Sequence, residues 1–144
     1  MPKNPPFDID ILLVEDNPVD VTMTKMALKR AGFLKEPTVL DDGGPALSLL
    51  GRTGKFHNRE TPDLVILDLN LKQIDGPEVL EFIRQEDKLK DLFVAIVSSS
   101  PVDVISRKTA GANCYFSKPN DLEGFLKLGG EILNCYVSSD SYLN

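Results

Sequence analysis

Long apolar runs are absent from this chain of 144 residues. The run Phe93–Val97 is far shorter than the roughly 20 apolar residues that a membrane-spanning helix needs. The opening stretch Met1–Asp8 carries three prolines and one lysine, where a signal peptide would have an apolar core. We therefore expect a cytoplasmic protein that has no membrane partner.

Basic residues are in short supply. The chain has 16 lysines and arginines against 22 acidic residues, which gives a formal net charge of −6. Such a chain repels the phosphates of nucleic acids and of anionic membranes, so we expect neither as a partner. The length suits one domain with its own core.

Cysteine and histidine are also scarce. Cys114 and Cys135 are the two cysteines and lack CxxC spacing, so we expect neither a metal site nor a disulfide framework. We interpret both as small buried apolar residues. The single histidine, His57, falls in a polar loop and is expected to be a solvated side chain rather than a catalyst.

Apolar segments alternate with segments of helical spacing. Strands are predicted at Ile9–Val14, Thr38–Leu40, Asp63–Asp68, Phe93–Val97 and Asn113–Phe116. Helix-start patterns follow at Asn17, Gly43, Asp75, Ser100 and Asn120, with capping-box spacing at Asp75 and Asn120. Five strands and five helices in alternation predict an α/β fold, in which helices cover both faces of a parallel sheet.

Polar side chains follow the ends of four of these strands. They are Glu15, Asp16, Asp68, Ser98 and Lys118. Parallel strands bring their carboxyl ends to one edge of a sheet, which is where ligands bind in open α/β sheets. The sequence therefore predicts that these side chains form one site.

Three of these side chains are carboxylates. Glu15, Asp16 and Asp68 would repel one another when crowded, and a hard divalent cation such as Mg²⁺ would relieve the repulsion. Lys118 and Ser98 offer a positive charge and a hydroxyl to phosphate oxygens. With charge on the phosphoryl group neutralised, Asp68 can attack phosphorus and become an aspartyl phosphate.

These residues resemble the receiver domain of response regulators over about Ile9 to Tyr136. The resemblance is carried by Glu15-Asp16-Asn17-Pro18, Leu67-Asp68-Leu69-Asn70-Leu71, Asp75-Gly76, Ser98, Gly111-Ala112-Asn113-Cys114-Tyr115 and Lys118-Pro119. It implies a flavodoxin-like, doubly wound sheet of order 2-1-3-4-5. The first, second and fifth of these motifs are similar to the small single-domain regulators that pair with bacterial phytochrome histidine kinases.

The resemblance implies a role for each residue of the acid cluster. Asp68 would be the phosphoacceptor. Asp16 would bind Mg²⁺ directly, Glu15 directly or through water, and Asn70 through its backbone carbonyl.

The resemblance also implies the switch. Lys118 would hold the phosphoryl group, Ser98 would move to bond it, and Tyr115 would swing inward behind Ser98. Two segments depart from the family pattern: Gly43-Gly44-Pro45 at the second helix, and Leu71–Ile74, which lacks the usual proline. The departures remove no chemical group, and they bear on the face presented to the kinase.

The expected function is a phosphorylatable switch, not an enzyme, with a sensor histidine kinase as partner. We expect an extension at 1–8, a receiver domain at 9–136 and a tail at 137–144, with no output domain. The expected homodimer uses the fourth helix, fifth strand, fifth helix and tail. The alternatives are a degenerate receiver that only scaffolds, which the intact site disfavours, and an aspartyl phosphatase, which the Asn at position 70 disfavours.

Overall fold

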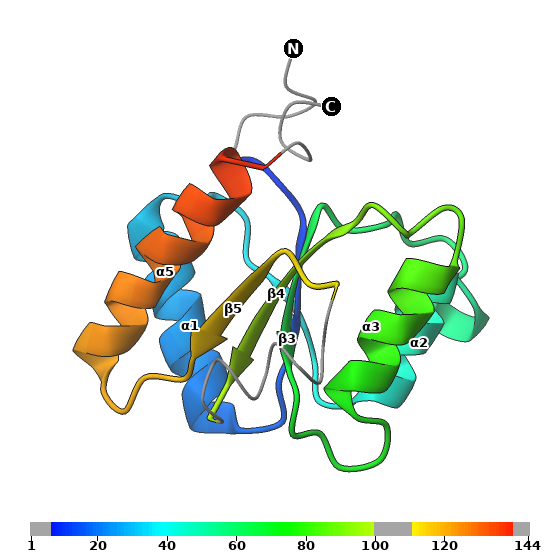
Figure 1. The fold of residues 1–144 in the computed structure, drawn as a ribbon, viewed down its shortest axis with the longest axis horizontal. Helices are drawn as coiled ribbons and strands as arrows, with labels where there is room; N and C mark the ends of the chain where they lie inside the picture. The colour runs from blue at the N-terminus through cyan, green and yellow to red at the C-terminus, as the bar shows by residue number, and fades with distance from the viewer. Residues whose placement is uncertain (1–6, 100–110, 140–144) are drawn as a thin grey trace.

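The computed structural model describes residues 7–99 and 111–139, which form a five-stranded sheet with helices on both faces (Figure 1). The strands are β1 (Ile11–Val14), β2 (Thr38–Leu40), β3 (Leu64–Asp68), β4 (Phe93–Ser98) and β5 (Cys114–Ser117). The helices are α1 (Pro18–Ala31), α2 (Gly43–Gly51), the short η1 (Gly54–Phe56), α3 (Gly76–Gln85) and α5 (Leu122–Val137). The helix expected to start at Ser100 lies outside the described residues.

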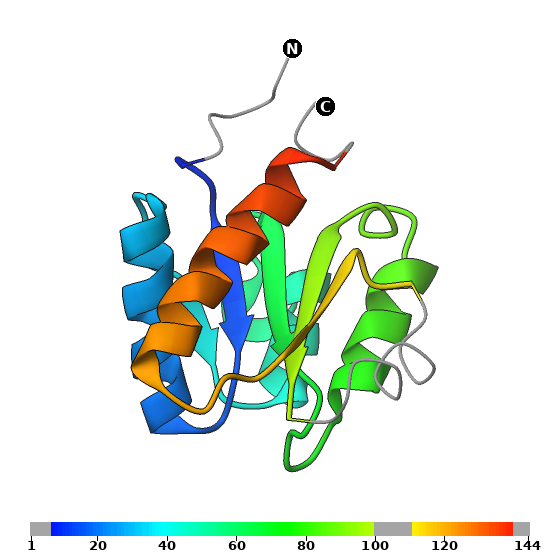
Figure 2. The ribbon, with the colours of Figure 1, turned by 60° about the vertical axis from the view of Figure 1, so that its left-hand side comes forward.

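The sheet is parallel throughout and has the order β2-β1-β3-β4-β5. Both the predicted fold class and the predicted strand order are confirmed. The strand arrowheads point the same way in Figure 2. Asp68 pairs with Val97, and Ser98 pairs with Ser117. The strand ends predicted to carry the site therefore share one edge of the sheet.

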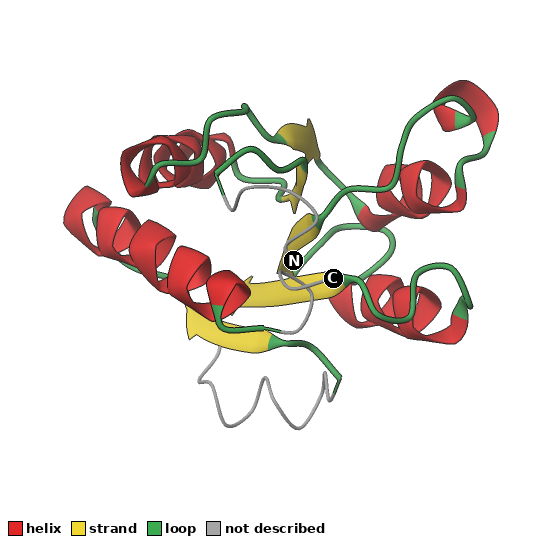
Figure 3. Ribbon diagram, turned by 90° about the horizontal axis from the view of Figure 1, so that it is seen from above, coloured by secondary structure: helices red, strands yellow, loops and turns green. Residues whose placement is uncertain are grey.

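Among the residues that the structure describes, two helices cover each face of the sheet. Helices α1 and α5 lie on one side, and α2 and α3 lie on the other (Figures 1 and 3). The three central strands β1, β3 and β4 are buried on both faces because their side chains alternate across the sheet into two separate cores. Helix α5 approaches α1 closely because Gly129 has no side chain, and a Cβ there would overlap the carbonyl oxygen of Ala27.

The helix-start predictions differ in outcome. Asn17 caps α1, because its side-chain oxygen accepts hydrogen bonds from the amides of Val19 and Asp20. The capping box predicted at Asp75 is wrong, because the Glu78 amide donates to the Asp75 backbone carbonyl rather than to its side chain. Helix α5 is capped by Asp121, one residue later than the Asn120 box predicts.

The prediction for the cysteines is wrong. Cys114 of β5 and Cys135 of α5 form a disulfide, with their Cα atoms 6.9 Å apart. The sequence contained no signal for this pair, because a separation of 21 residues does not reveal that one turn of α5 lies over β5.

His57 lies exposed directly after η1, as expected of a solvated side chain. No helix within residues 7–99 and 111–139 combines the length and the apolar character needed to cross a membrane.

Candidate functional site

The first part of the site is the turn between β1 and α1. The Glu15 amide donates to the Leu40 carbonyl, which extends the sheet pairing to the end of β1. The side chain of Glu15 is buried, and one of its oxygens accepts a hydrogen bond of 3.2 Å from the Asn17 amide. Asp16 is half-buried beside it. The capping residue of α1 therefore also holds the Glu15 carboxylate in place.

Asp68 lies at the end of β3 with only 3 % of its surface exposed. One carboxylate oxygen accepts a hydrogen bond of 3.3 Å from the Asn70 amide. The start of α3 lies close behind, where a Cβ at position 76 would come within 2.6 Å of the Asp68 carbonyl oxygen. Gly76 is therefore required for this approach of α3 to the end of β3.

The three predicted carboxylates gather in one place. Oxygen atoms of Glu15, Asp16 and Asp68 lie within 4.8 Å of one another. The donor set is entirely carboxylate, which suits a hard divalent cation rather than a soft transition metal. These three residues can thus hold a metal ion.

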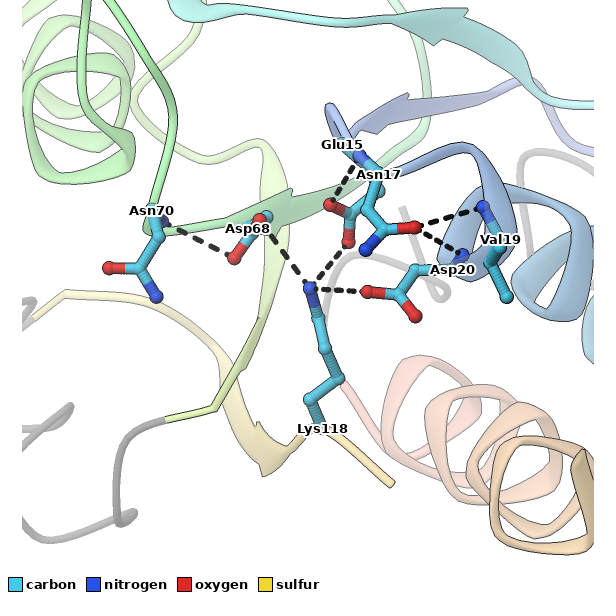
Figure 4. Close-up of polar contacts among 7 residues, drawn as sticks. All are labelled: Glu15, Asn17, Val19, Asp20, Asp68, Asn70 and Lys118. Carbon is cyan, nitrogen blue, oxygen red and sulfur yellow. Dashed lines mark hydrogen bonds and ion pairs between the residues drawn. The ribbon is translucent and has the colours of Figure 1, made fainter. Parts of the chain in front are cut away.

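Lys118 reaches this cluster from the end of β5 (Figure 4). Its ammonium nitrogen lies 2.9 Å from a Glu15 oxygen, 2.9 Å from an Asp20 oxygen and 3.5 Å from an Asp68 oxygen. The Lys118 amide donates to the Ser98 carbonyl, which fixes the backbone beneath the side chain. The structure therefore brings Lys118 to both acidic segments, as the sequence predicts.

Burial and charge act in opposite directions on these groups. Burial raises the pKa of the Glu15 carboxyl to about 7; the hydrogen bond from Lys118 opposes this rise, and the charge of Asp68 adds to it. Burial lowers the pKa of the Lys118 ammonium, but the hydrogen bonds to Glu15 and Asp20 outweigh burial, so the net shift is upward. Lys118 therefore stays charged at neutral pH, whereas Glu15 readily takes up a proton without a metal.

The two predicted switch residues occupy different parts of the fold. Ser98 is fully buried at the end of β4. The hydroxyl of Tyr115 accepts a hydrogen bond of 3.2 Å from the Ala112 amide, in the loop before β5. Arg84 of α3 binds that loop through the Gly111 carbonyl at 2.7 Å. In this state the tyrosine hydroxyl is held at the amino end of β5, away from the end that carries Lys118.

Two functional candidates were missed by the sequence analysis. Asp20, in the first turn of α1, was given no role there, yet it pairs with Lys118. Asp42, which directly precedes α2, was given no role either. Its carboxylate accepts hydrogen bonds from the amides of Gln73 at 3.0 Å and Ile74 at 3.3 Å.

Contacts between the start of α2 and the loop after Asp68 give a physical reason for both departures from the family pattern. The loop that lacks its proline is held instead by the Asp42 carboxylate, whose pKa is lowered chiefly by the hydrogen bond from the Gln73 amide. Gly43 replaces a more helix-friendly residue because a Cβ there would overlap the carbonyl oxygen of Ile74. The loop after Asp68 is thus fixed from α2.

A parallel sheet of this order, with an acid pair, a buried aspartate and a lysine at its carboxyl edge, defines a class of phosphoryl-accepting signalling domains. Residues 11–128 match the family model of the response regulator receiver domain, and the chain belongs to that family. Members of this family are mostly signalling proteins.

The chain is 37 % identical over 128 residues to the response regulator Rcp1 of Synechocystis sp. (strain ATCC 27184 / PCC 6803 / Kazusa), covering 88 % of this chain and 86 % of Rcp1. Its fold is similar to the phosphorylated cyanobacterial phytochrome response regulator RcpA, with a TM-score of 0.84, 32 % identity, and coverage of 91 % and 95 % of the two chains. The Mn²⁺-bound form of Rcp1 gives a TM-score of 0.82 at 32 % identity, covering 91 % of this chain and 96 % of Rcp1.

Proposed function

We propose that this chain is a phosphorylatable switch that accepts a phosphoryl group on Asp68 from a sensor histidine kinase. The observation that carries the proposal is the placement of a buried aspartate 3.5 Å from the Lys118 ammonium, beside two further carboxylates. The aspartate supplies a nucleophile, and the lysine supplies a positive charge for the incoming group.

The transfer is a displacement at phosphorus. An oxygen of Asp68 forms the new O–P bond while the N–P bond of the kinase phosphohistidine breaks, and the electron pair of that bond stays on the imidazole. The Lys118 ammonium then holds an oxygen of the phosphoryl group. We propose that Glu15, Asp16, Asp68 and the Asn70 backbone carbonyl would hold Mg²⁺, and that this ion would neutralise charge on the phosphoryl oxygens.

The proposed kinase is a bacterial phytochrome kinase. Support comes from the similarity to RcpA, which is a phytochrome response regulator. Purified kinases charged with labelled phosphate would be mixed with the chain for short times. We expect a phytochrome kinase to transfer its labelled phosphate to the chain within the first minute. Kinases that respond to unrelated stimuli should transfer far less label in the same time. Equal transfer from all kinases would contradict the proposed pairing.

We also propose that Ser98 and Tyr115 form the switch: Ser98 lies at the edge that carries Asp68, and Tyr115 lies on the neighbouring strand β5 with its hydroxyl held away from that edge. With Mg²⁺ and beryllofluoride as a phosphate mimic, the NMR signals of the Tyr115 ring should shift, because Ser98 bonds the mimic and leaves space for the ring. Ser98→Ala should reduce this shift. The ring of Tyr136, packed against Phe93 at a centroid distance of 5.2 Å, is the control and should not move. An unchanged Tyr115 would refute the switch.

The final proposal for function is a homodimer through the fourth helix, β5, α5 and the tail at 137–144. Helix α5 supports it with two exposed apolar side chains, Leu122 at 40 % and Val137 at 39 % exposure. The receiver domain proper would span 9–136, after an extension at 1–8. Light scattering should show a dimer for the full chain and a monomer after truncation following Tyr136. A full chain that stays monomeric at high micromolar concentration, with and without beryllofluoride, would contradict the dimer.

A further inference from the structure

Lys118 is shared between the phosphoacceptor and a carboxylate outside the metal cluster. Its two contacts of 2.9 Å are to Glu15 and Asp20, and the longest of the three, at 3.5 Å, is to Asp68. An ammonium has three N–H donors, so these three carboxylates can engage all of them. Before any phosphoryl group arrives, the two shortest contacts of the ammonium are therefore to carboxylates other than the phosphoacceptor.

Asp20 is firmly placed. It lies in the first turn of α1, where its amide donates a hydrogen bond of 3.2 Å to the capping side chain of Asn17. Its side chain is only 16 % exposed, close to the 13 % of Lys118. Figure 4 shows its carboxylate on the side of the ammonium away from Asp68. The ion pair with Asp20 therefore draws Lys118 away from the phosphoacceptor.

We propose that Asp20 is a positioning residue that competes with the phosphoryl group for Lys118; this inference rests on the function proposed above. When Asp68 carries a phosphoryl group, Lys118 leaves Asp20 to bind a phosphoryl oxygen. Asp20 then remains as a largely buried carboxylate without its cation, beside a group with more negative charge than Asp68 had. Asp20 thus disfavours the phosphorylated state and shortens its life.

The test compares the full chain with Asp20→Asn, which keeps the shape of the side chain and removes its charge. Each protein is phosphorylated with acetyl phosphate and Mg²⁺, the donor is removed, and the phosphorylated fraction is followed by intact mass. We expect Asp20→Asn to retain the phosphoryl group about fivefold longer, which corresponds to roughly 1 kcal/mol of additional barrier to hydrolysis. Glu78→Gln removes an exposed carboxylate from the first turn of α3 and should behave as wild type.

A double-mutant cycle distinguishes an effect of Asp20 through its ion pair with Lys118 from a general effect of its negative charge. In wild type, Asp20→Asn should tighten beryllofluoride binding at saturating Mg²⁺; in a Lys118→Gln background it should change the affinity less than about twofold. An equal effect in both backgrounds, or a shorter phosphoryl lifetime in Asp20→Asn, would overturn the proposal. A wild type that gains no phosphoryl mass would instead refute the proposed function.

If Asp20→Asn does not fold, a structure of the wild type with bound beryllofluoride tests the proposal. A crystal structure of that complex should show the Lys118 nitrogen on the mimic and beyond about 4 Å, the limit of an ion pair, from the Asp20 carboxylate. Retention of the 2.9 Å contact seen without the mimic would overturn the proposal.

Discussion

Replacing Asp68 by asparagine should reduce phosphorylation by roughly three orders of magnitude or more, the scale expected when an enzyme loses its nucleophile. Asparagine keeps the size of the side chain, but its amide oxygen is a far weaker nucleophile than a carboxylate. The buried position at the end of β3 leaves little room for another group to attack in its place. The initial rate of mass gain from acetyl phosphate and Mg²⁺ measures the effect.

The matched control for this variant is Asp63→Asn. Asp63 directly precedes the same strand and accepts a hydrogen bond from the Asp10 amide, at the opposite edge of the sheet. The Asp63→Asn variant should be phosphorylated at the rate of wild type. If Asp68→Asn gained a phosphoryl group as fast as that control, the assignment of Asp68 would be wrong.

Magnesium should raise the melting temperature by about 5–10 °C at a hundredfold excess over its dissociation constant. The physical reason is the crowding of Glu15, Asp16 and Asp68 within 4.8 Å, which a cation relieves only in the folded state. Asp16→Asn should raise the metal-free melting temperature and reduce the shift that Mg²⁺ causes. Asp41→Asn, an exposed carboxylate after β2, is the control and should keep the full shift. An undiminished shift in Asp16→Asn would refute the cluster as the metal site.

The magnesium effect should depend on pH through Glu15. Its folded-state pKa is raised from 4.5 to about 7 by burial. The protonated carboxyl therefore stabilises the fold below pH 4.5, and this contribution is lost as the pH rises through about 7. Metal binding needs the ionised form, so the Mg²⁺-induced rise in melting temperature should be larger at pH 8 than at pH 6. Glu15→Gln should remove this difference, and a pH-independent shift in wild type would contradict the role of Glu15.

The strands and the edge that they share could be predicted from the sequence. Segments such as Leu64–Leu67 are continuously apolar and end in a carboxylate, which indicates a strand buried on both faces with a polar end. Alternation with helical segments then places all strand ends together. The gathering of Glu15, Asp16, Asp68 and Lys118 follows from topology alone.

The contacts that modulate the site could not be predicted, because they join residues that no local pattern connects. A negative side chain such as Asp20 is favoured at the start of a helix. Because this local preference is enough to explain Asp20, the sequence does not indicate its ion pair with Lys118. Asp42 reaches a loop that lies beyond α2 and β3. The disulfide between Cys114 and Cys135 likewise depends on how α5 lies over β5.

The central claim is that Asp68 of the wild-type chain carries the phosphoryl group, and chemical trapping tests it most directly. The chain is phosphorylated with acetyl phosphate and Mg²⁺, treated with borohydride, which reduces an aspartyl phosphate to homoserine, and then digested for sequencing by mass spectrometry. The account predicts homoserine at position 68 and at no other aspartate. Homoserine at Asp16, at Asp20 or at any other position in place of Asp68, or none at all, would contradict it.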